Sequence, residues 1–222
     1  MLTVAQAAER LGVGPEQVRR LIRAGRLAAH KVGRTLVLDD DAVDGRARLP
    51  VTAGRALAPR TAWAALWQLS GEDVDWLSAA DRSRLVARLR GYDAERLVAV
   101  SRDRAERYEL RVLPAYRQRV LAADGVVPSG PNAAAAVGAD IVAAEVHCAA
   151  GTLTALRREL GLSDRGQPNL VVRMPRYDRL DLTGRAHVPA AVVAVDLAES
   201  AEVRTRRAGL DMFAAALSDL AR

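Results

Sequence analysis

The sequence predicts an α+β protein in two parts: a small winged helix-turn-helix at the N-terminus and a larger C-terminal α+β domain. Half of the 222 residues are hydrophobic and 27% are charged, which is typical of a chain that folds. Helical spacing of apolar residues, interrupted by glycine, opens the chain, whereas the remainder mixes helical and alternating patterns. The third observation is the uneven distribution of charge.

The positive charge is concentrated in the first quarter of the chain. The net charge is +6. Residues 1–60 carry 11 basic and six acidic side chains, whereas residues 61–222 carry 22 basic and 21 acidic side chains. A basic surplus confined to one small part indicates a localised surface for a polyanion.

Two short helices joined by a glycine-containing turn are predicted at the N-terminus. Thr3 is followed three residues later by Gln6, which fits a capping box for a helix that runs to about Leu11. Gly12-Val13-Gly14 ends this helix, and Pro15 suits the first position of a second one. The buried stripe of the second helix falls on Val18, Leu21 and Ile22.

A β-hairpin and a further helical turn follow. Residues 27–38 form two short apolar segments around Gly33, with Lys31 and Arg34 near the tip, and Asp39-Asp40-Asp41 then caps the turn. This order of elements resembles the winged helix-turn-helix of the MerR/excisionase type over roughly residues 1–45, which implies binding to double-stranded DNA. The similar stretches are residues 2–8, 18–22, 25–29 and 32–34; the family usually has an aromatic residue or Arg where this chain continues with Thr35-Leu36-Val37.

The second helix also predicts DNA binding on physical grounds. An α-helix fits the major groove, where Arg reads guanine and Gln reads adenine through paired hydrogen bonds. Gln17 and Arg20 lie one turn apart on the outer face, and we assign them to bases. We assign Arg19, Arg23, Lys31 and Arg34 mainly to phosphates, and we expect Thr3 to contact a phosphate through its hydroxyl or the free amides of a helix N-terminus.

Glu16 is the acidic exception on this helix. It either accepts a hydrogen bond from cytosine N4 or only interacts favourably with the helix dipole. The alternative for the whole face is a solvated helix in a protein-interaction module, but a surplus of five positive charges in residues 1–38 favours DNA. Because one such module binds weakly alone, we expect two copies on paired half-sites of an operator.

Simple features exclude several classes of protein. The N-terminus lacks the basic segment and apolar core of a signal peptide, and no apolar run approaches the roughly 18 residues that cross a bilayer, so a cytoplasmic protein without membrane contact is expected. Cys148 is the only cysteine, which excludes a disulfide within the chain and indicates a buried small apolar residue. The histidines lack ligand spacing, so no metal and no cofactor are expected.

The C-terminal domain is predicted to span residues 61–222. Residues 46–60 are rich in Arg, Gly and Pro and suit either a plain linker or an arginine-bearing tether along DNA. Helices are predicted at 59–69, 79–90, 94–100, 113–121, 133–137, 152–160 and 201–220, and strands at 108–112, 126–128, 140–146 and 169–174. Residues 190–197 form either a buried strand or a short helix. In the last helix the inward residues are expected to be Val203, Leu210, Phe213, Ala214, Leu217 and Leu220.

No arrangement in this domain predicts catalysis. Residues 129–132 lack the lysine of a phosphate-binding loop, and Asp140 supplies only one of the two acids needed for nucleotidyl transfer. A triad of Ser129, His187 and Asp196 is conceivable, but no nucleophile-elbow glycines surround the serine. The sequence therefore predicts no enzyme; an enzyme with a DNA-targeting head is an alternative on grounds of size alone.

The C-terminal domain resembles the C-terminal half of AbiEi-type antitoxins over roughly residues 60–215. The similar stretches are Ser129-Gly130 leading to Ala133, Ala134 and Gly138, then residues 170–173, and finally residues 193–200 with Arg204 and Gly209. The resemblance implies structural roles for Ser129-Gly130 and for Asp196 and Arg204. These last two form either a buried pair or a simple cap and a surface arginine.

Two functions follow from these patterns. The first is a transcriptional repressor that is also the antitoxin of a two-gene module, in which residues 1–45 bind the operator and the C-terminal half counteracts a nucleotidyltransferase toxin, as the resemblance implies. The alternative is a phage- or recombination-type excisionase-like regulator whose C-terminal domain is a dimerisation or ligand-sensing module.

Overall fold

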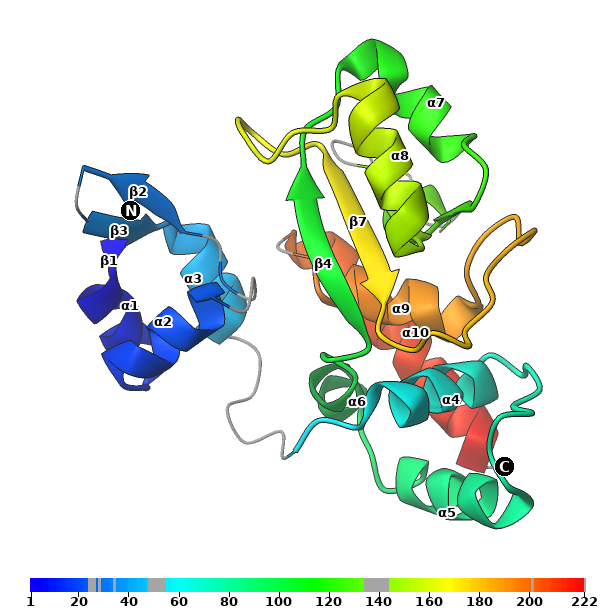
Figure 1. Cartoon of the computed structure of the whole chain (residues 1–222). Coiled ribbons are helices and arrows are strands. Elements are labelled where there is room, and N and C mark those ends of the chain that lie inside the picture. Colours follow the sequence, from blue (N-terminus) through cyan, green and yellow to red (C-terminus); the bar gives the residue numbers. More distant parts are fainter. Residues whose placement is uncertain are drawn as a thin grey trace. The chain divides into compact units, whose positions relative to one another are not determined.

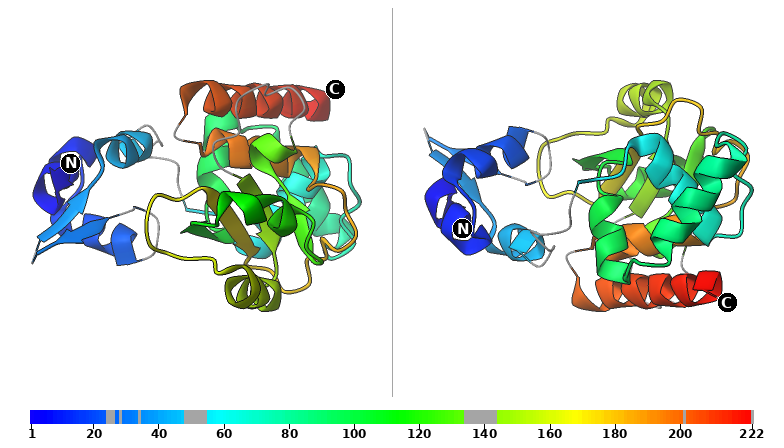
Figure 2. Two further views of the ribbon diagram at one scale, coloured as in Figure 1. Left: turned by 90° about the horizontal axis from the view of Figure 1, so that it is seen from above. Right: turned by 90° about the horizontal axis from the view of Figure 1, so that it is seen from below.

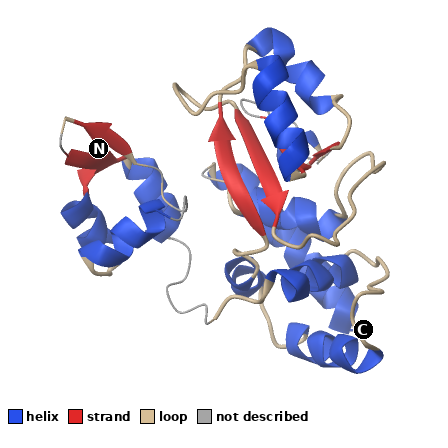
Figure 3. Cartoon of the chain, in the orientation of Figure 1, coloured by secondary structure: helices blue, strands red, loops and turns tan. Residues whose placement is uncertain are grey.

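The computed structural model describes residues 1–23, 27, 29–33, 35–47, 55–133, 144–200 and 202–221. The chain divides into two compact units, Met1–Ala53 and Gly54–Arg222, each of which is described by itself. Each unit combines helices with a small sheet, so the protein is α+β as the sequence predicts (Figure 3). The predicted linker, 46–60, lies partly outside the described residues.

The N-terminal unit is a helix-turn-helix with a wing-like sheet. Its elements are β1 (Leu2–Thr3), α1 (Val4–Leu11), α2 (Pro15–Arg23), β2 (His30–Val32), β3 (Thr35–Leu38) and α3 (Asp40–Ala47). Thr3 and Gln6 form the predicted capping box, and Gly12 ends α1 in the left-handed conformation with φ of 64°. Gly25 suits the end of α2 in the sequence, but it lies outside the described residues.

The strand β1 is the element that local sequence patterns do not predict. The sheet has the order β1-β3-β2, with antiparallel pairing throughout, and Leu2 lies opposite Leu38. The chain therefore enters α1 directly from the sheet. The buried core between the helices and the sheet consists of Ala7, Ala8, Leu11, Val18, Leu21, Leu27, Leu38 and Val43.

The C-terminal unit contains a mixed four-stranded sheet of order β4-β7-β6-β5. Its elements are α4 (Pro59–Leu69), α5 (Ala79–Leu89), α6 (Ala94–Val100), β4 (Ala105–Leu110), the 3₁₀ turn η1 (Pro114–Tyr116), α7 (Arg117–Leu121), β5 (Val126–Pro128), the 3₁₀ turn η2 (Gly130–Asn132), β6 (Ala144–Cys148), α8 (Ala150–Leu160), β7 (Leu170–Pro175), α9 (Ala190–Ala198) and α10 (Val203–Ala221). The parallel strands β6 and β7 are joined through α8, and the other neighbours are antiparallel. The predicted helix 133–137 lies almost entirely outside the described residues, as does the start of the strand predicted at 140–146.

The two faces of this sheet differ in chemistry. The face beneath α8 is apolar, and its core includes Val146, Val172, Leu153, Leu156 and Leu160. The opposite face is covered by the helical layer that contains α9 and α10 (Figures 1 and 2). Because strand side chains alternate between faces, Glu145, His147 and Arg173 point toward that helical layer.

Residues 190–197, for which the sequence left strand and helix open, form α9. Every residue of α9 from Ala191 to Ala198 is buried, which explains why periodicity is uninformative there. Pro189 stands at its N-cap, a position that needs no backbone donor. Among the described helices, none combines the length and apolar character needed to cross a bilayer.

The inward face predicted for α10 is wrong at two positions. Val203 is 65% exposed and Ala214 is exposed, whereas the buried residues are Thr205, Gly209 and Phe213. The contact stripe follows Gly209 because α9 crosses there with its backbone against the glycine. A Cβ at Gly209 would lie 2.5 Å from the Ala194 carbonyl oxygen and collide with the Ala198 amide.

We expect Gly209→Ala to destabilise the unit by about 1–3 kcal/mol, because the added methyl group must push two helix backbones apart. Gly151→Ala in α8 is the matched control, since a Cβ there meets no atom within 4 Å and alanine is the better helix former by about 0.5–1 kcal/mol. Urea unfolding measures both variants. Equal stabilisation by the two substitutions would contradict the close crossing.

Candidate functional site

The helix α2 presents arginines on the side away from its core. Val18 and Leu21 are buried, while Arg19 and Arg20 are exposed and Gln17 is half-buried. The backbone of Arg23 ends the helix, but its side chain lies outside the described residues. The two described arginines are thus free to reach a groove of DNA, and Gln17 has less freedom to do so.

Glu16 contacts Arg19 within the same helix. Its carboxylate lies 3.4 Å from Arg19 Nη1, an exposed i, i+3 pair, and it occupies the first turn, where the helix dipole favours an acid. Exposed pairs of this kind contribute about 0–1 kcal/mol, so Arg19 can exchange Glu16 for a phosphate. The position of Glu16 in the first turn is the one that the dipole interpretation requires.

Thr3 is occupied by the capping box. Its hydroxyl donates to Gln6 Oε1 at 3.0 Å and accepts from the Gln6 amide at 3.3 Å, and its own amide donates to Gln6 Oε1 at 2.9 Å. The residue is exposed. The predicted phosphate contact through the hydroxyl therefore competes with the cap that begins α1.

The predicted wing is a hairpin with Gly33 at its tip. Val32 pairs with Thr35 and Lys31 with Leu36, and Gly33 has φ of 61°, the left-handed region that favours glycine. Lys31 is exposed on β2. Arg34 lies outside the described residues.

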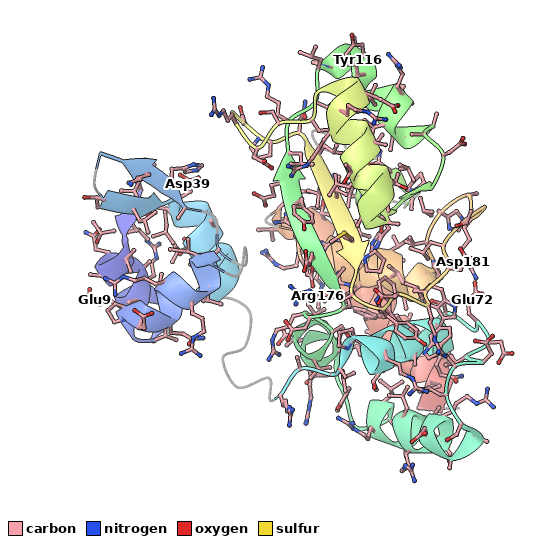
Figure 4. The ribbon with its side chains drawn as sticks, in the orientation of Figure 1. Glu9, Asp39, Glu72, Tyr116, Arg176 and Asp181 are labelled. Carbon is pink, nitrogen blue, oxygen red and sulfur yellow. The ribbon has the colours of Figure 1, made fainter. Side chains whose placement is uncertain are left out.

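Acidic residues after the wing are tied to α1. Asp39 lies where β3 passes into α3 (Figure 4), with its carboxylate 3.4 Å from His30 Nε2. Arg10 on α1 contacts Asp44 at 2.7 Å and Asp40 at 3.3 Å. The two Arg10 pairs connect α3 with α1, and all three acids have partners within the unit.

A second concentration of polar side chains lies inside the C-terminal unit, on the sheet face that α9 covers. Its side chains are at most 17% exposed. They come from the residues after α6 and β5, from β6 and β7, and from α9 and its C-terminal end. We call this set the buried ionic cluster; its members are Arg104, Ser129, Glu145, His147, Arg173, Asp196 and Glu199.

Asp196 is the centre of the buried ionic cluster. One oxygen, Oδ1, accepts from Arg104 Nη2 at 2.5 Å and lies 3.1 Å from Arg173 Nε. The other, Oδ2, lies 2.7 Å from His147 Nε2 and accepts from the Ser129 hydroxyl. Because an ionised carboxylate only accepts hydrogen bonds, His147 carries its proton on Nε2.

The two arginines connect the remaining acids. Arg104 and Arg173 each approach Glu199 at 2.6 Å, and Arg173 Nε donates to Glu145 at 2.5 Å. Gly130 makes room for Glu145, since a Cβ there would lie 3.0 Å from the carboxyl carbon.

Burial and ion pairing act in opposite directions on the carboxyl groups. Burial raises the pKa of Asp196, but the charges of Arg173 and Arg104 and the hydrogen bond with His147 outweigh it, so the pKa lies well below its usual range. The pKa of Glu199 is also lowered, because the charges of Arg104 and Arg173 outweigh the effect of burial. At Glu145 burial outweighs Arg173, and the pKa is raised. The separate, buried Cys148 thiol has a pKa raised by burial to about 11, as expected for an inert side chain.

The structure contradicts the conceivable triad. His187 is exposed, with Nδ1 3.0 Å from the Val188 carbonyl oxygen, and the Ser129 hydroxyl is bonded to Asp196. In a catalytic triad the histidine stands between serine and carboxylate, whereas here the carboxylate stands between serine and His147. Of the two alternatives for Asp196 and Arg204, the structure excludes the buried pair, because Arg204 is exposed on α10.

Sequence reasoning missed Arg104, Glu145, His147 and Arg173 as a group. The available signal was polar residues inside otherwise apolar strands, as in Ala144–Cys148 and Leu170–Pro175. Such residues need buried partners, although the sequence does not say which. Over the described ranges, no three His, Cys, Asp or Glu side chains are grouped so as to hold a metal ion.

Comparison with known proteins identifies the N-terminal unit alone. The family model described as "Helix-turn-helix domain" matches residues 1–44. Searches of curated proteins and of solved structures find no match to the chain. The match indicates that the N-terminal unit is a DNA-binding domain.

We expect the free energy of unfolding to fall as pH drops below about 4, because Asp196 and Glu199 have folded-state pKa values below the unfolded values of about 3.9 and 4.3. Their stabilising contribution is complete above those values and is lost as pH falls toward the folded pKa. Glu145 acts oppositely, since a raised pKa stabilises only at lower pH. Urea unfolding across pH 3–7 measures the summed effect of these carboxyl groups on the free energy of unfolding.

Asp196→Asn should lower stability at pH 7 and make the acid-side fall shallower. Asp211→Asn is the control, because Asp211 forms an exposed i, i+4 pair with Arg207. A stability profile for Asp196→Asn that runs parallel to the wild type would contradict an ionised Asp196 in the folded protein.

Proposed function

We propose that the protein is a transcriptional regulator that binds operator DNA in the cytoplasm through residues 1–45. One observation carries the proposal: the helix that follows the turn, α2, buries Val18 and Leu21 and exposes Arg19 and Arg20, within the unit that matches a helix-turn-helix domain. A helix so arranged has the size and charge to enter the major groove.

We further propose a division of roles among the basic residues. Arg20, with Gln17, reads base edges, while Arg19 and Lys31 contact phosphates; Arg23 and Arg34 belong to the phosphate group as well. Arg19 can take the phosphate role because its exposed pair with Glu16 is weak enough for a phosphate to replace the carboxylate. The small surplus of charge supports two copies on paired half-sites.

The division predicts different losses for different variants. Arg20→Ala should weaken binding to the gene's own promoter by about 1–3 kcal/mol and leave binding to random duplex nearly unchanged. Arg19→Ala should weaken both, and should reduce the slope of log K against log salt by about one. Fluorescence anisotropy over a salt series with the two duplexes measures these effects.

Arg204→Ala is the control, since this arginine is exposed in the other unit. If Arg20→Ala prefers the promoter over random duplex as strongly as the control variant does, base reading by α2 is refuted. Failure of the wild type to distinguish the promoter from random duplex would refute operator binding itself.

For the C-terminal unit we propose the role of antitoxin, with the whole protein repressing its own operon and counteracting a nucleotidyltransferase toxin without itself being an enzyme. The resemblance to AbiEi-type antitoxins rests on short stretches, and Ser129, Arg173 and Asp196, from three of them, lie together in the buried ionic cluster. Gly209, from the last stretch, packs against α9. This spatial coherence supports the proposal.

The antitoxin role predicts that DNA binding and neutralisation separate. When a nucleotidyltransferase encoded beside this gene is expressed alone, growth should stop, and coexpression of this protein should restore it. Arg19→Ala with Arg20→Ala should still restore growth, because the substitutions lie in the N-terminal unit. Loss of rescue by this folded double variant, or on deleting residues 1–45, would contradict a C-terminal antitoxin.

A further inference from the structure

The end of the C-terminal unit formed by η1, α7 and α8 differs in charge from the rest of the unit. It lies opposite α5 (Figure 1). Residues 111–125 and 150–168 carry six of the 22 arginines in residues 61–222, but only three of the 21 acidic residues. An almost neutral unit therefore has one distinctly basic end.

Apolar side chains stand among these arginines. Leu113 is 56% exposed, and its neighbours Pro114 and Ala115 are also exposed. Tyr116 is half-buried at the same end (Figure 4), and the Arg119 guanidinium lies 5.2 Å from the centroid of its ring. We call this region the Leu113 surface; it consists of Arg111, Leu113, Pro114, Ala115, Tyr116, Arg119 and Arg165.

The two chain segments that form the Leu113 surface are fixed to each other. The backbones of Arg111 and Ser163 exchange hydrogen bonds of 2.8 and 3.0 Å. Gly166 leaves room for the Arg111 side chain, because a Cβ there would lie 2.9 Å from Arg111 Nη1. The two backbone segments thus keep their relative position before a partner arrives, which reduces the entropy lost on binding.

Two of the three acids at this end of the unit pair with arginines that are not part of the Leu113 surface. Asp164 pairs with Arg157 at 2.9 Å, and Glu159 pairs with Arg158 at 3.1 Å. Arg111, Arg119 and Arg165 are exposed. Their charge remains available to an external anion.

We propose that the Leu113 surface binds an acidic protein segment that carries a large apolar side chain. The positive charge is complementary to carboxylates. The exposed Leu113 is complementary to an apolar side chain, which a nucleic-acid backbone does not offer. Tyrosine and arginine around an apolar centre is the composition of protein–protein binding sites. This site lies outside the DNA-binding unit and is independent of operator binding.

The test uses the full chain and a short synthetic helical peptide, rich in glutamate, with two leucines one turn apart. Sister peptides replace either the glutamates by glutamine or the leucines by serine, and a random DNA duplex serves as a fourth probe. Fluorescence anisotropy should show binding of the first peptide and about tenfold weaker binding of each sister peptide.

Two protein variants locate the site. Leu113→Ser, and separately Arg119→Glu with Arg165→Glu, should each weaken binding of the first peptide about tenfold. Arg179→Glu with Arg204→Glu makes the same change in net charge at exposed arginines elsewhere and should bind as the wild type does. Thermal melting confirms that each variant is folded.

The outcomes are decisive in either direction. The proposal is supported if the two Leu113-surface variants bind the first peptide more weakly than the wild type does and bind the DNA duplex equally well. The proposal is overturned if the wild type does not bind the peptide, or if the control variant loses as much peptide binding as the two Leu113-surface variants. It is also overturned if those variants lose more DNA binding than peptide binding. The last result would make the surface a phosphate-binding site and would leave the operator proposal for α2 intact.

Discussion

The C-terminal unit depends on the way one buried carboxylate is held. Asp196 extends from α9 to the sheet and meets groups from four other segments: Arg104 after α6, Ser129 after β5, His147 on β6 and Arg173 on β7. Without these partners an ionised carboxylate could not remain inside the protein. The same contacts therefore satisfy the charge and join the helical layer to the sheet.

A buried network of this kind restricts the fold more than it stabilises it. Removing ions from water costs several kcal/mol each, so the pairs return little net energy. A shift of β6 by one residue, however, would turn Glu145 and His147 into the apolar core beneath α8 and leave Val146 facing arginines. The ionic face thus selects one register of the sheet, and Gly130 supplies the close approach to Glu145 that this register needs.

Local signals predicted much of this molecule. The capping box at Thr3, the turn at Gly12 and the proline at position 15 each act within a few residues, and the corresponding helices begin or end where expected. Contacts between distant segments were not predictable from the sequence. Examples are the pairing of β1 with β3 and the ion pair between Arg173 on β7 and Glu199 after α9. At the face of α2 that is proposed to bind DNA, the sequence predicted the helix and its arginines, whereas the contacts of Thr3 and Glu16 required coordinates.

The position of β4 at the edge of the sheet has a consequence for self-association. Its outer side leaves backbone groups available to another strand, a common route to aggregation. Two copies of β4 aligned antiparallel and in full register would place Glu106 opposite Glu109 twice, and like charges repel across strands. The charge pattern of β4 thus disfavours pairing of two copies of the chain through their sheet edges.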